Sequence, residues 1–127
     1  MKRRLLIIDD DAIIHVALMD LLSSDDLEIY SVYNPLGGFK WLEKASVDLI
    51  ICDIGLPKMN GIEFVRQLRK KNKQVGVLFF TGVSAQVTQE DIVELNILDV
   101  INKGDYDVFA FKKCVYEFVF GYRVQAH

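Results

Sequence analysis

Two groups of aspartates follow apolar runs of the chain and could form one acidic cluster. Asp9, Asp10 and Asp11 come directly after one run, and Asp53 comes directly after another. Two carboxylates about 4 Å apart repel each other by about 4 kcal/mol at an effective dielectric constant of about 20, so such a cluster requires a bound cation or proton. Because all of these ligands are oxygens, the pattern predicts a hard divalent cation, Mg²⁺, as cofactor.

A hydroxyl group and an ammonium group follow two later apolar runs. Thr81 ends one run, before Gly82, and Lys103 ends the other. Phosphoryl transfer uses such a set: a carboxylate nucleophile, a metal ion and a lysine that neutralise the transferring oxygens, and a hydroxyl that donates a hydrogen bond. Each residue alone is common in a structural role, as a helix cap or a solvated side chain. Together they favour phosphoryl-transfer chemistry.

Apolar runs rich in β-branched residues alternate five times with longer stretches of helical period, which predicts five strands and five helices. The predicted strands are Arg4 to Asp9, Glu28 to Tyr33, Asp48 to Asp53, Val75 to Phe80 and Val100 to Asn102. Most of them are continuously apolar, as parallel strands covered by helices on both faces should be.

Capping residues predict where the helices begin. Candidate caps of the first four helices are Asp11, Asn34, Asn60 and Thr88. Pro35 follows its cap at the first helical position, and Thr88 with Asp91 resembles a capping box. The fifth helix is expected to begin near Asp105 or Asp107 and to run to about Phe120.

The alternation predicts an α/β fold with a doubly wound, five-stranded parallel sheet, since crossovers are right-handed and cover both faces. Ligands of such sheets bind beyond the carboxyl ends of the strands. The acidic cluster, Thr81 and Lys103 all follow strands, so we expect them to converge at one rim of the sheet.

Four segments together resemble the receiver domains of response regulators. They are Leu-Ile-Ile-Asp-Asp-Asp at 6–11, Ile-Cys-Asp-Ile-Gly-Leu-Pro-Lys-Met-Asn-Gly at 51–61, Thr81-Gly82 and Lys103. The similarity spans nearly the whole chain, and the segment from Asp53 to Gly61 is its most specific part. The resemblance implies a flavodoxin-like sheet of strand order 2-1-3-4-5 and one receiver domain over residues 1–127.

The resemblance also implies a role for each site residue. In receiver domains a phosphohistidine of a sensor histidine kinase or phosphotransfer protein gives its phosphoryl group to an acceptor aspartate, which here is Asp53. The implied Mg²⁺ ligands are Asp9, Asp10, Asp53 and the backbone carbonyl of Gly55. Thr81 grips the phosphoryl group and Lys103 pairs with it. The domain then switches conformation to signal to a partner or an output domain, so it catalyses only its own phosphorylation and dephosphorylation.

Four positions depart from the family pattern. Gly104 replaces the proline that usually follows the lysine through a cis bond, and a cis bond without proline costs about 2.5–4 kcal/mol, which favours a trans loop. Val100 replaces the switch aromatic three residues before Lys103, so a rotating ring cannot report activation. Gly55 and Val83 occupy positions that tune phosphoryl lifetime in the family, and neither side chain can hydrogen-bond an attacking water.

Length and charge exclude several classes of protein. A chain of 127 residues fits one domain, and no apolar run approaches the ~20 residues that span a bilayer. The first apolar run is too short for a signal peptide, so a cytoplasmic protein without a membrane partner is expected. A net charge of −3 argues against direct nucleic-acid binding.

Several residues favour a structural over a functional interpretation. Cys52 and Cys114 stand singly, which predicts buried thiols. His15 lies inside the first predicted helix and is expected to pack or to face water. A basic cluster is expected to be a solvated helix end, because cations there interact favourably with the negative end of the helix dipole. The cluster consists of Arg66, Arg69, Lys70, Lys71 and Lys73.

The fifth predicted helix is rich in aromatic side chains, more than one helix can bury against one sheet. Rings such as Phe109, Tyr116 or Phe120 are therefore candidates for a homodimer contact that involves the fourth helix, fifth strand and fifth helix.

The sequence bears on three alternative functions. A phosphatase of the haloacid-dehalogenase type requires a second aspartate two residues after the nucleophile, where this chain has Gly55. A receiver that has lost phosphorylation and serves as a docking module stays an open alternative, although the acid, hydroxyl and lysine set is complete. Dinucleotide binding is disfavoured because no G-x-G-x-x-G follows the first strand.

Overall fold

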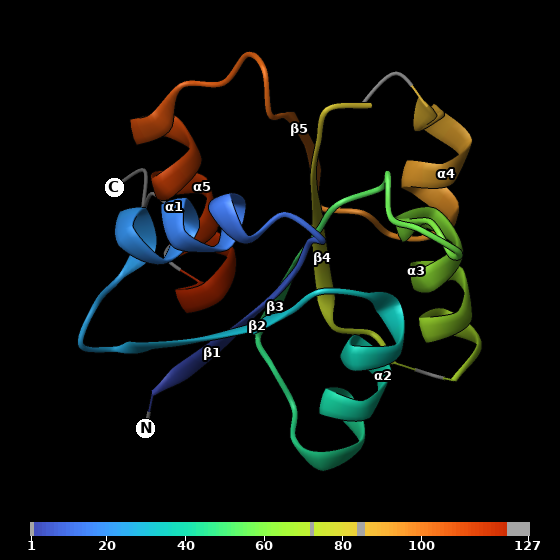
Figure 1. Cartoon of the computed structure of the whole chain (residues 1–127), viewed down its shortest axis with the longest axis horizontal. Coiled ribbons are helices and arrows are strands. Elements are labelled where there is room, and N and C mark those ends of the chain that lie inside the picture. Colours follow the sequence, from blue (N-terminus) through green and yellow to red (C-terminus); the bar gives the residue numbers. More distant parts are fainter. Residues whose placement is uncertain (1, 72, 84–85, 122–127) are drawn as a thin grey trace.

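A computed structural model describes residues 2–71, 73–83 and 86–121, which form a five-stranded parallel sheet (Figure 1). The strands are β1 (Arg3–Ile8), β2 (Leu27–Val32), β3 (Leu49–Cys52), β4 (Gly76–Thr81) and β5 (Asp99–Asn102). Their order across the sheet is β2-β1-β3-β4-β5. The predicted flavodoxin-like fold and its strand order are confirmed.

Helices cover both faces of this sheet. They are α1 (Ala12–Leu22), α2 (Pro35–Lys44), α3 (Gly61–Lys70), α4 (Gln89–Glu94) and α5 (Val108–Phe120). Figure 1 shows α1 and α5 on one face and α2, α3 and α4 on the other. Two apolar clusters fill the layers between sheet and helices, because successive strand residues point to opposite faces. Leu6 and Ile8 belong to the layer under α2 and α3, whereas Leu5 and Ile7 belong to the layer under α1 and α5.

The predicted caps fix the helix starts. Asp11, Asn34 and Asn60 each accept a backbone N–H of the first turn, and Thr88 with Asp91 forms the predicted capping box. The fifth helix begins after Asp107, whose side chain accepts from the Ala110 amide at 2.9 Å. Asp11 thus serves as a cap, while its neighbours Asp9 and Asp10 remain available to the site.

The two strands that carry acids end one residue earlier than predicted. β1 ends at Ile8 and β3 at Cys52, so that Asp9 and Asp53 lie just beyond the sheet. The amide of Asp9 still donates to Val32 O, and that of Asp53 to Ile8 O. The backbone amide of each acid is therefore hydrogen-bonded to the sheet, while the chain after it continues into a loop.

α4 is the shortest helix of the described chain, and none of its six residues is buried. Arginine side chains from α3 attach it to the remainder of the fold. Arg66 lies 3.5 Å from Asp91, and Arg69 donates to the carbonyls of Leu95, Lys73 and Val75 at 2.8–2.9 Å.

The basic cluster is therefore only partly the solvated helix end that was predicted. Lys70, Lys71 and Lys73 are exposed, whereas Arg66 and Arg69 are half-buried. Burial also lowers the pKa of the Arg69 guanidinium.

Across the described residues, no helix has the length and apolar character needed to span a membrane.

Candidate functional site

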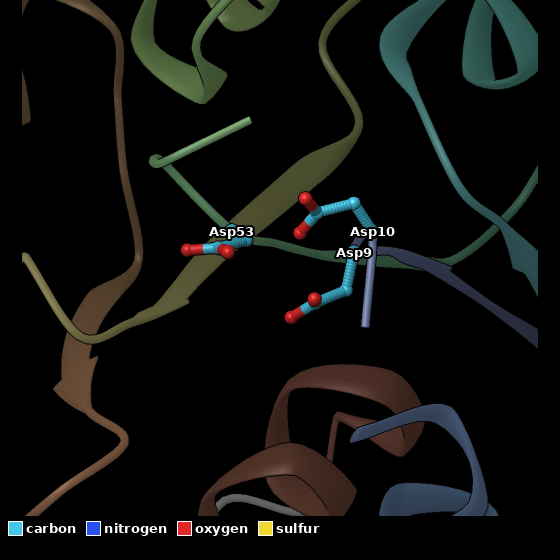
Figure 2. A group of neighbouring side chains, drawn as sticks. All are labelled: Asp9, Asp10 and Asp53. Carbon is cyan, nitrogen blue, oxygen red and sulfur yellow. The ribbon is translucent and has the colours of Figure 1, made fainter. Parts of the chain in front are cut away.

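Three aspartates meet at the carboxyl ends of β1 and β3, as Figure 2 shows. Asp9 and Asp10 follow β1, Asp53 follows β3, and one carboxylate oxygen from each lies within 4.8 Å of the others. Asp9 and Asp53 are 2% and 7% exposed, whereas Asp10 is open to solvent. This set of hard oxygen donors, two buried and one accessible, suits a divalent cation such as Mg²⁺ that keeps several of its waters.

The two carboxylate oxygens of Asp53 have different partners. Oδ1 accepts from the amides of Ile54 at 2.7 Å and Gly55 at 3.3 Å, and Oδ2 accepts from Lys103 Nζ at 3.1 Å. These bonds fix the plane of the carboxylate. A carboxylate presented in this way can act as a nucleophile towards phosphorus.

Lys103 bridges two of the acids. Its Nζ lies 2.7 Å from Asp9 Oδ2 and 3.1 Å from Asp53 Oδ2. Burial tends to lower the pKa of the lysine, but its hydrogen bonds to Asp9 and Asp53 and their charges outweigh burial and raise it. Burial raises the pKa of the Asp9 carboxyl, against the opposing effect of Lys103. The site therefore holds a fixed positive charge beside a cluster that is costly to ionise fully.

Thr81 lies at the end of β4 with its side chain fully buried. Its Oγ1 accepts from the amide of Val83 at 3.2 Å, so the hydroxyl proton does not take part in that bond and can be donated elsewhere. Lys103 N donates to Thr81 O at 3.0 Å, which ties the two residues together through the backbone. The structure thus brings Asp9, Asp10, Asp53 and Lys103 together and places Thr81 next to Lys103 through the backbone, whereas Asp11 caps α1 and is not part of the cluster.

A glycine determines the shape of the loop between β3 and α3. A Cβ on Gly61 would lie 2.2 Å from the carbonyl oxygen of Asp53, and the Gly61 amide donates to Ile54 O at 2.9 Å. Real Cβ atoms essentially never approach this closely, so any larger residue at position 61 would displace the backbone of Asp53. This contact is a physical reason for the glycine at the end of the Asp53–Gly61 segment.

The structure shows the surroundings of the four residues that depart from the family pattern. The described chain contains no cis peptide bond, so Lys103–Gly104 is trans, as expected without proline. Val100 is half-buried and packs against the apolar layer under α2, α3 and α4. A Cβ on Gly55 would lie 3.8 Å from Val83, so these two positions flank each other beside Asp53.

Sequence reasoning missed the part played by His15. The residue is buried as a packed histidine, but its Nε2 lies 2.7 Å from the backbone carbonyl of Asp9, and its ring lies 4.6 Å from that of Tyr33. Its Nδ1 is buried without a hydrogen-bond partner, an arrangement that typically costs about 1–3 kcal/mol. The available signal was its spacing, since His15 shares the buried face of α1 with Leu18 and Leu22.

The cysteines and the aromatic side chains of α5 differ from one another in burial. Cys52 is fully buried, as predicted, whereas Cys114 is half-buried. Of the three candidate dimer rings, Phe109 is exposed, while Tyr116 and Phe120 are half-buried against each other. The aromatic residues of the sequence continue to Tyr122, which lies outside the described residues.

Comparison with known proteins places residues 5–107 in the family described as the response regulator receiver domain. A protein-glutamate methylesterase/protein-glutamine glutaminase of Treponema denticola is 33% identical over 105 residues, which are 79% of this chain and 28% of that protein. The cyclic di-GMP phosphodiesterase response regulator RpfG of Xanthomonas campestris is 26% identical over 103 residues, 78% of this chain and 27% of that protein. The chain thus spans less than a third of these relatives.

Solved structures share the fold. The response regulator TrrA of Thermotoga maritima, in complex with Mg²⁺-BeF, has a TM-score of 0.79, with 24% identity, 92% of this chain covered and 99% of that chain. A CheY-like receiver domain from Methylobacillus flagellatus has a TM-score of 0.78, with 18% identity, 93% of this chain covered and 99% of that chain. With the family match over residues 5–107, these observations lead to one conclusion: the chain belongs to the response regulator receiver domain family, and is a phospho-acceptor signalling domain.

Proposed function

We propose that Asp53 accepts a phosphoryl group from a phosphohistidine of a sensor histidine kinase or phosphotransfer protein. A carboxylate oxygen of Asp53 attacks phosphorus and the P–N bond breaks. The departing imidazole nitrogen keeps the electron pair and takes up a proton. The observation that carries this proposal is the convergence of Asp53, Lys103 and Thr81 at the rim, with Lys103 Nζ 3.1 Å from the Asp53 carboxylate. Lys103 and the Thr81 hydroxyl would then stabilise the oxygens of the transferred group.

Mg²⁺ is proposed as the cofactor, held by Asp9, Asp10, Asp53 and the backbone carbonyl of Gly55. The ion would neutralise the charge that the incoming phosphoryl oxygens add to the acids. Support comes from the three carboxylate oxygens within 4.8 Å of one another and from the Mg²⁺ in the solved complex of TrrA. The same set favours catalysis by the domain of its own phosphorylation over any reaction on a separate substrate.

The acceptor is tested with a small phosphodonor such as acetyl phosphate. Intact-mass measurement should show one phosphoryl adduct on the protein in the presence of Mg²⁺ and none in its absence. Asp53→Asn should abolish the adduct, because an amide is too poor a nucleophile to form the acyl phosphate. An adduct of equal yield on the Asn variant would refute the assignment. No adduct on the parent protein, with Mg²⁺ present, would favour the docking-module alternative.

The metal is tested by its effect on thermal stability. Mg²⁺ should raise the Tm of the unphosphorylated protein, since an ion that binds only the folded state stabilises it by mass action. Asp10→Ala should remove most of this response, because Asp10 is the exposed member of the acidic set. If Asp10→Ala responds to Mg²⁺ as the parent does, the ion binds elsewhere.

The signal is proposed to leave through the surface of α4, β5 and α5. Exposed apolar side chains occur on this surface, notably Val93 of α4 and Phe109 of α5, at 79% and 84% exposure. A homodimer contact through these residues would bury them in a two-fold interface. The domain is proposed to be cytoplasmic, with neither nucleic acid nor membrane as a direct partner, and residues 1–127 are proposed to form one receiver domain.

A further inference from the structure

His15 is a buried polar residue whose side chain contacts the backbone of Asp9 in the acidic site. It lies in α1 with 3% of its surface exposed, among residues that pack α1 onto the sheet. Its Nε2 lies 2.7 Å from the backbone carbonyl oxygen of Asp9. Because a carbonyl oxygen only accepts, Nε2 carries the proton of this hydrogen bond.

The partner of His15 is a carbonyl that lies beyond the sheet ladder. β1 ends at Ile8, and Asp9 retains one ladder bond, from its amide to Val32 O at 3.3 Å. The Asp9 carboxylate is bonded to Asp11 N at 2.9 Å and to Lys103 at 2.7 Å. His15 therefore supplies, from the helix, the hydrogen bond that a neighbouring strand would otherwise give to the Asp9 carbonyl.

The surroundings of the imidazole ring are better explained by its hydrogen bond to Asp9 than by apolar packing alone. The Tyr33 ring lies 4.6 Å from the imidazole at an angle of 56°, which restricts its rotation. The second nitrogen, Nδ1, is buried without a partner, so packing alone would be better served by an apolar side chain. The bond from Nε2 to Asp9 is the favourable interaction that the imidazole contributes here.

The consequence for the site follows from peptide planarity. The Asp9 carbonyl belongs to the planar unit that also contains the amide of Asp10, so fixing this carbonyl orients both acids at once. We propose that His15 is a positioning residue for the Asp9–Asp10 pair and thereby for Mg²⁺ binding. This inference rests on the proposed metal site.

The test compares Mg²⁺ affinity, measured by isothermal titration calorimetry on unphosphorylated protein, in three variants. His15→Leu removes the donor, and affinity should fall about tenfold, as is typical when a residue that orients a metal ligand is lost. His15→Gln keeps an N–H donor at similar reach, and affinity should stay within about threefold of the parent. Tyr116→Phe is the matched control: it removes the 2.8 Å bond from Tyr116 to Leu22 O at the far end of α1, and affinity should not change.

A second readout does not depend on metal. In the parent, nitrogen NMR of the imidazole should show the tautomer with the proton on Nε2. Hydrogen exchange of the Asp10 and Asp11 amides should accelerate in His15→Leu and not in His15→Gln or Tyr116→Phe. These results would support His15 even if the parent bound no Mg²⁺, an outcome that would instead refute the proposed metal site.

Three outcomes would overturn the positioning role. The first is parental Mg²⁺ affinity and parental amide exchange in His15→Leu. The second is an equal loss in Tyr116→Phe, which would indicate general loosening of α1. The third is a proton on Nδ1 in place of Nε2.

Discussion

At the scale of single residues, Lys103 limits the repulsion within the site. Asp9 and Asp53 share its ammonium through contacts of 2.7 and 3.1 Å, and both carboxylates are buried. In a medium of low polarity such a shared ion pair is strong, but the desolvation of three charges offsets much of its favourable energy. The raised pKa of the buried Asp9 carboxyl reflects this balance, and a divalent cation would shift it towards full ionisation.

The two cysteines should differ from each other in reactivity. Burial, with the charges of Asp99 and Glu117, raises the pKa of the half-buried Cys114 thiol to about 11. Since the thiolate is the nucleophile, iodoacetamide should alkylate Cys114 at pH 8 about 100-fold more slowly than a thiol of ordinary pKa. Cys52, fully buried, should not react at all in the folded protein. Peptide mapping after timed alkylation measures both rates.

The acid beside Cys114 provides the control. Asp99→Asn should speed alkylation at pH 8, since it removes a negative charge 3.9 Å from the sulfur, whereas Asp105→Asn should not. The folded pKa of about 11 lies above the ordinary pKa of 9.0 for a cysteine thiol. The thiol's contribution to stability is therefore present below about pH 9 and is lost as the pH rises towards 11. Fast labelling of Cys114 at pH 8 would contradict this account.

Sequence reasoning identified those site residues whose positions follow from the strands. Asp53 and Lys103 directly follow β3 and β5, and Thr81 is the last residue of β4, so the topology alone brings them to one rim. Sequence reasoning could not predict the contacts of His15 or Arg69. Each side chain hydrogen-bonds a backbone carbonyl, and the position of that carbonyl depends on the tertiary structure and not on the periodicity of the sequence.

At the scale of elements, the caps were the most predictable feature. Asp, Asn and Thr caps act within four residues, so their hydrogen bonds depend on local sequence alone. Strand ends were less predictable. β4 runs from Gly76 to Thr81 in place of Val75 to Phe80, because pairing with β3 and β5 sets the register of the strand and the apolar run does not.

Arg69 should be essential for the attachment of α4. Its guanidinium donates to the carbonyls of Leu95, Lys73 and Val75 at 2.8–2.9 Å. Arg69→Met should lower the free energy of unfolding by about 2 kcal/mol, since it leaves these carbonyls without a charged donor. It should also speed hydrogen exchange in α4. Urea denaturation and exchange measured by mass spectrometry would test both effects.

Two further variants control for charge. Arg69→Lys should recover little of the loss, since a single ammonium cannot reproduce the planar fork of donors. Lys70→Met, at the exposed neighbouring position, should change stability by less than about 0.5 kcal/mol. If Lys70→Met were as destabilising as Arg69→Met, helix charge would explain the effect and the carbonyl contacts would not.

At the scale of the whole molecule, the site residues lie at one rim, and the exposed ring of Phe109 lies on α5. If the proposed output is a homodimer, phosphorylation should shift the protein from monomer to dimer. Such a change requires a few kcal/mol of coupling, and burying a Phe side chain contributes about 1.5–3 kcal/mol. Light scattering after size exclusion, with and without phosphodonor and Mg²⁺, measures the mass.

Phe109→Ser should keep the phosphorylated protein monomeric. Leu36→Ser, at another exposed apolar side chain on α2, should leave the dimer intact. An unchanged mass of the parent at verified full phosphorylation would rule out phosphate-driven dimerisation and assign Phe109 to a different protein partner.

The weak attachment of α4 also determines where proteases can cut the native chain. Cleavage favours segments that leave the fold at low cost, and α4 has no buried residue. The stretch from 74 to 102 contains neither lysine nor arginine, so trypsin has no site between Lys73 and Lys103. A glutamate-specific protease, in contrast, meets Glu90 and Glu94, both exposed on α4. The nicked chain would keep β1 to β4 on one fragment and β5 with α5 on the other, held together by the ladder between β4 and β5.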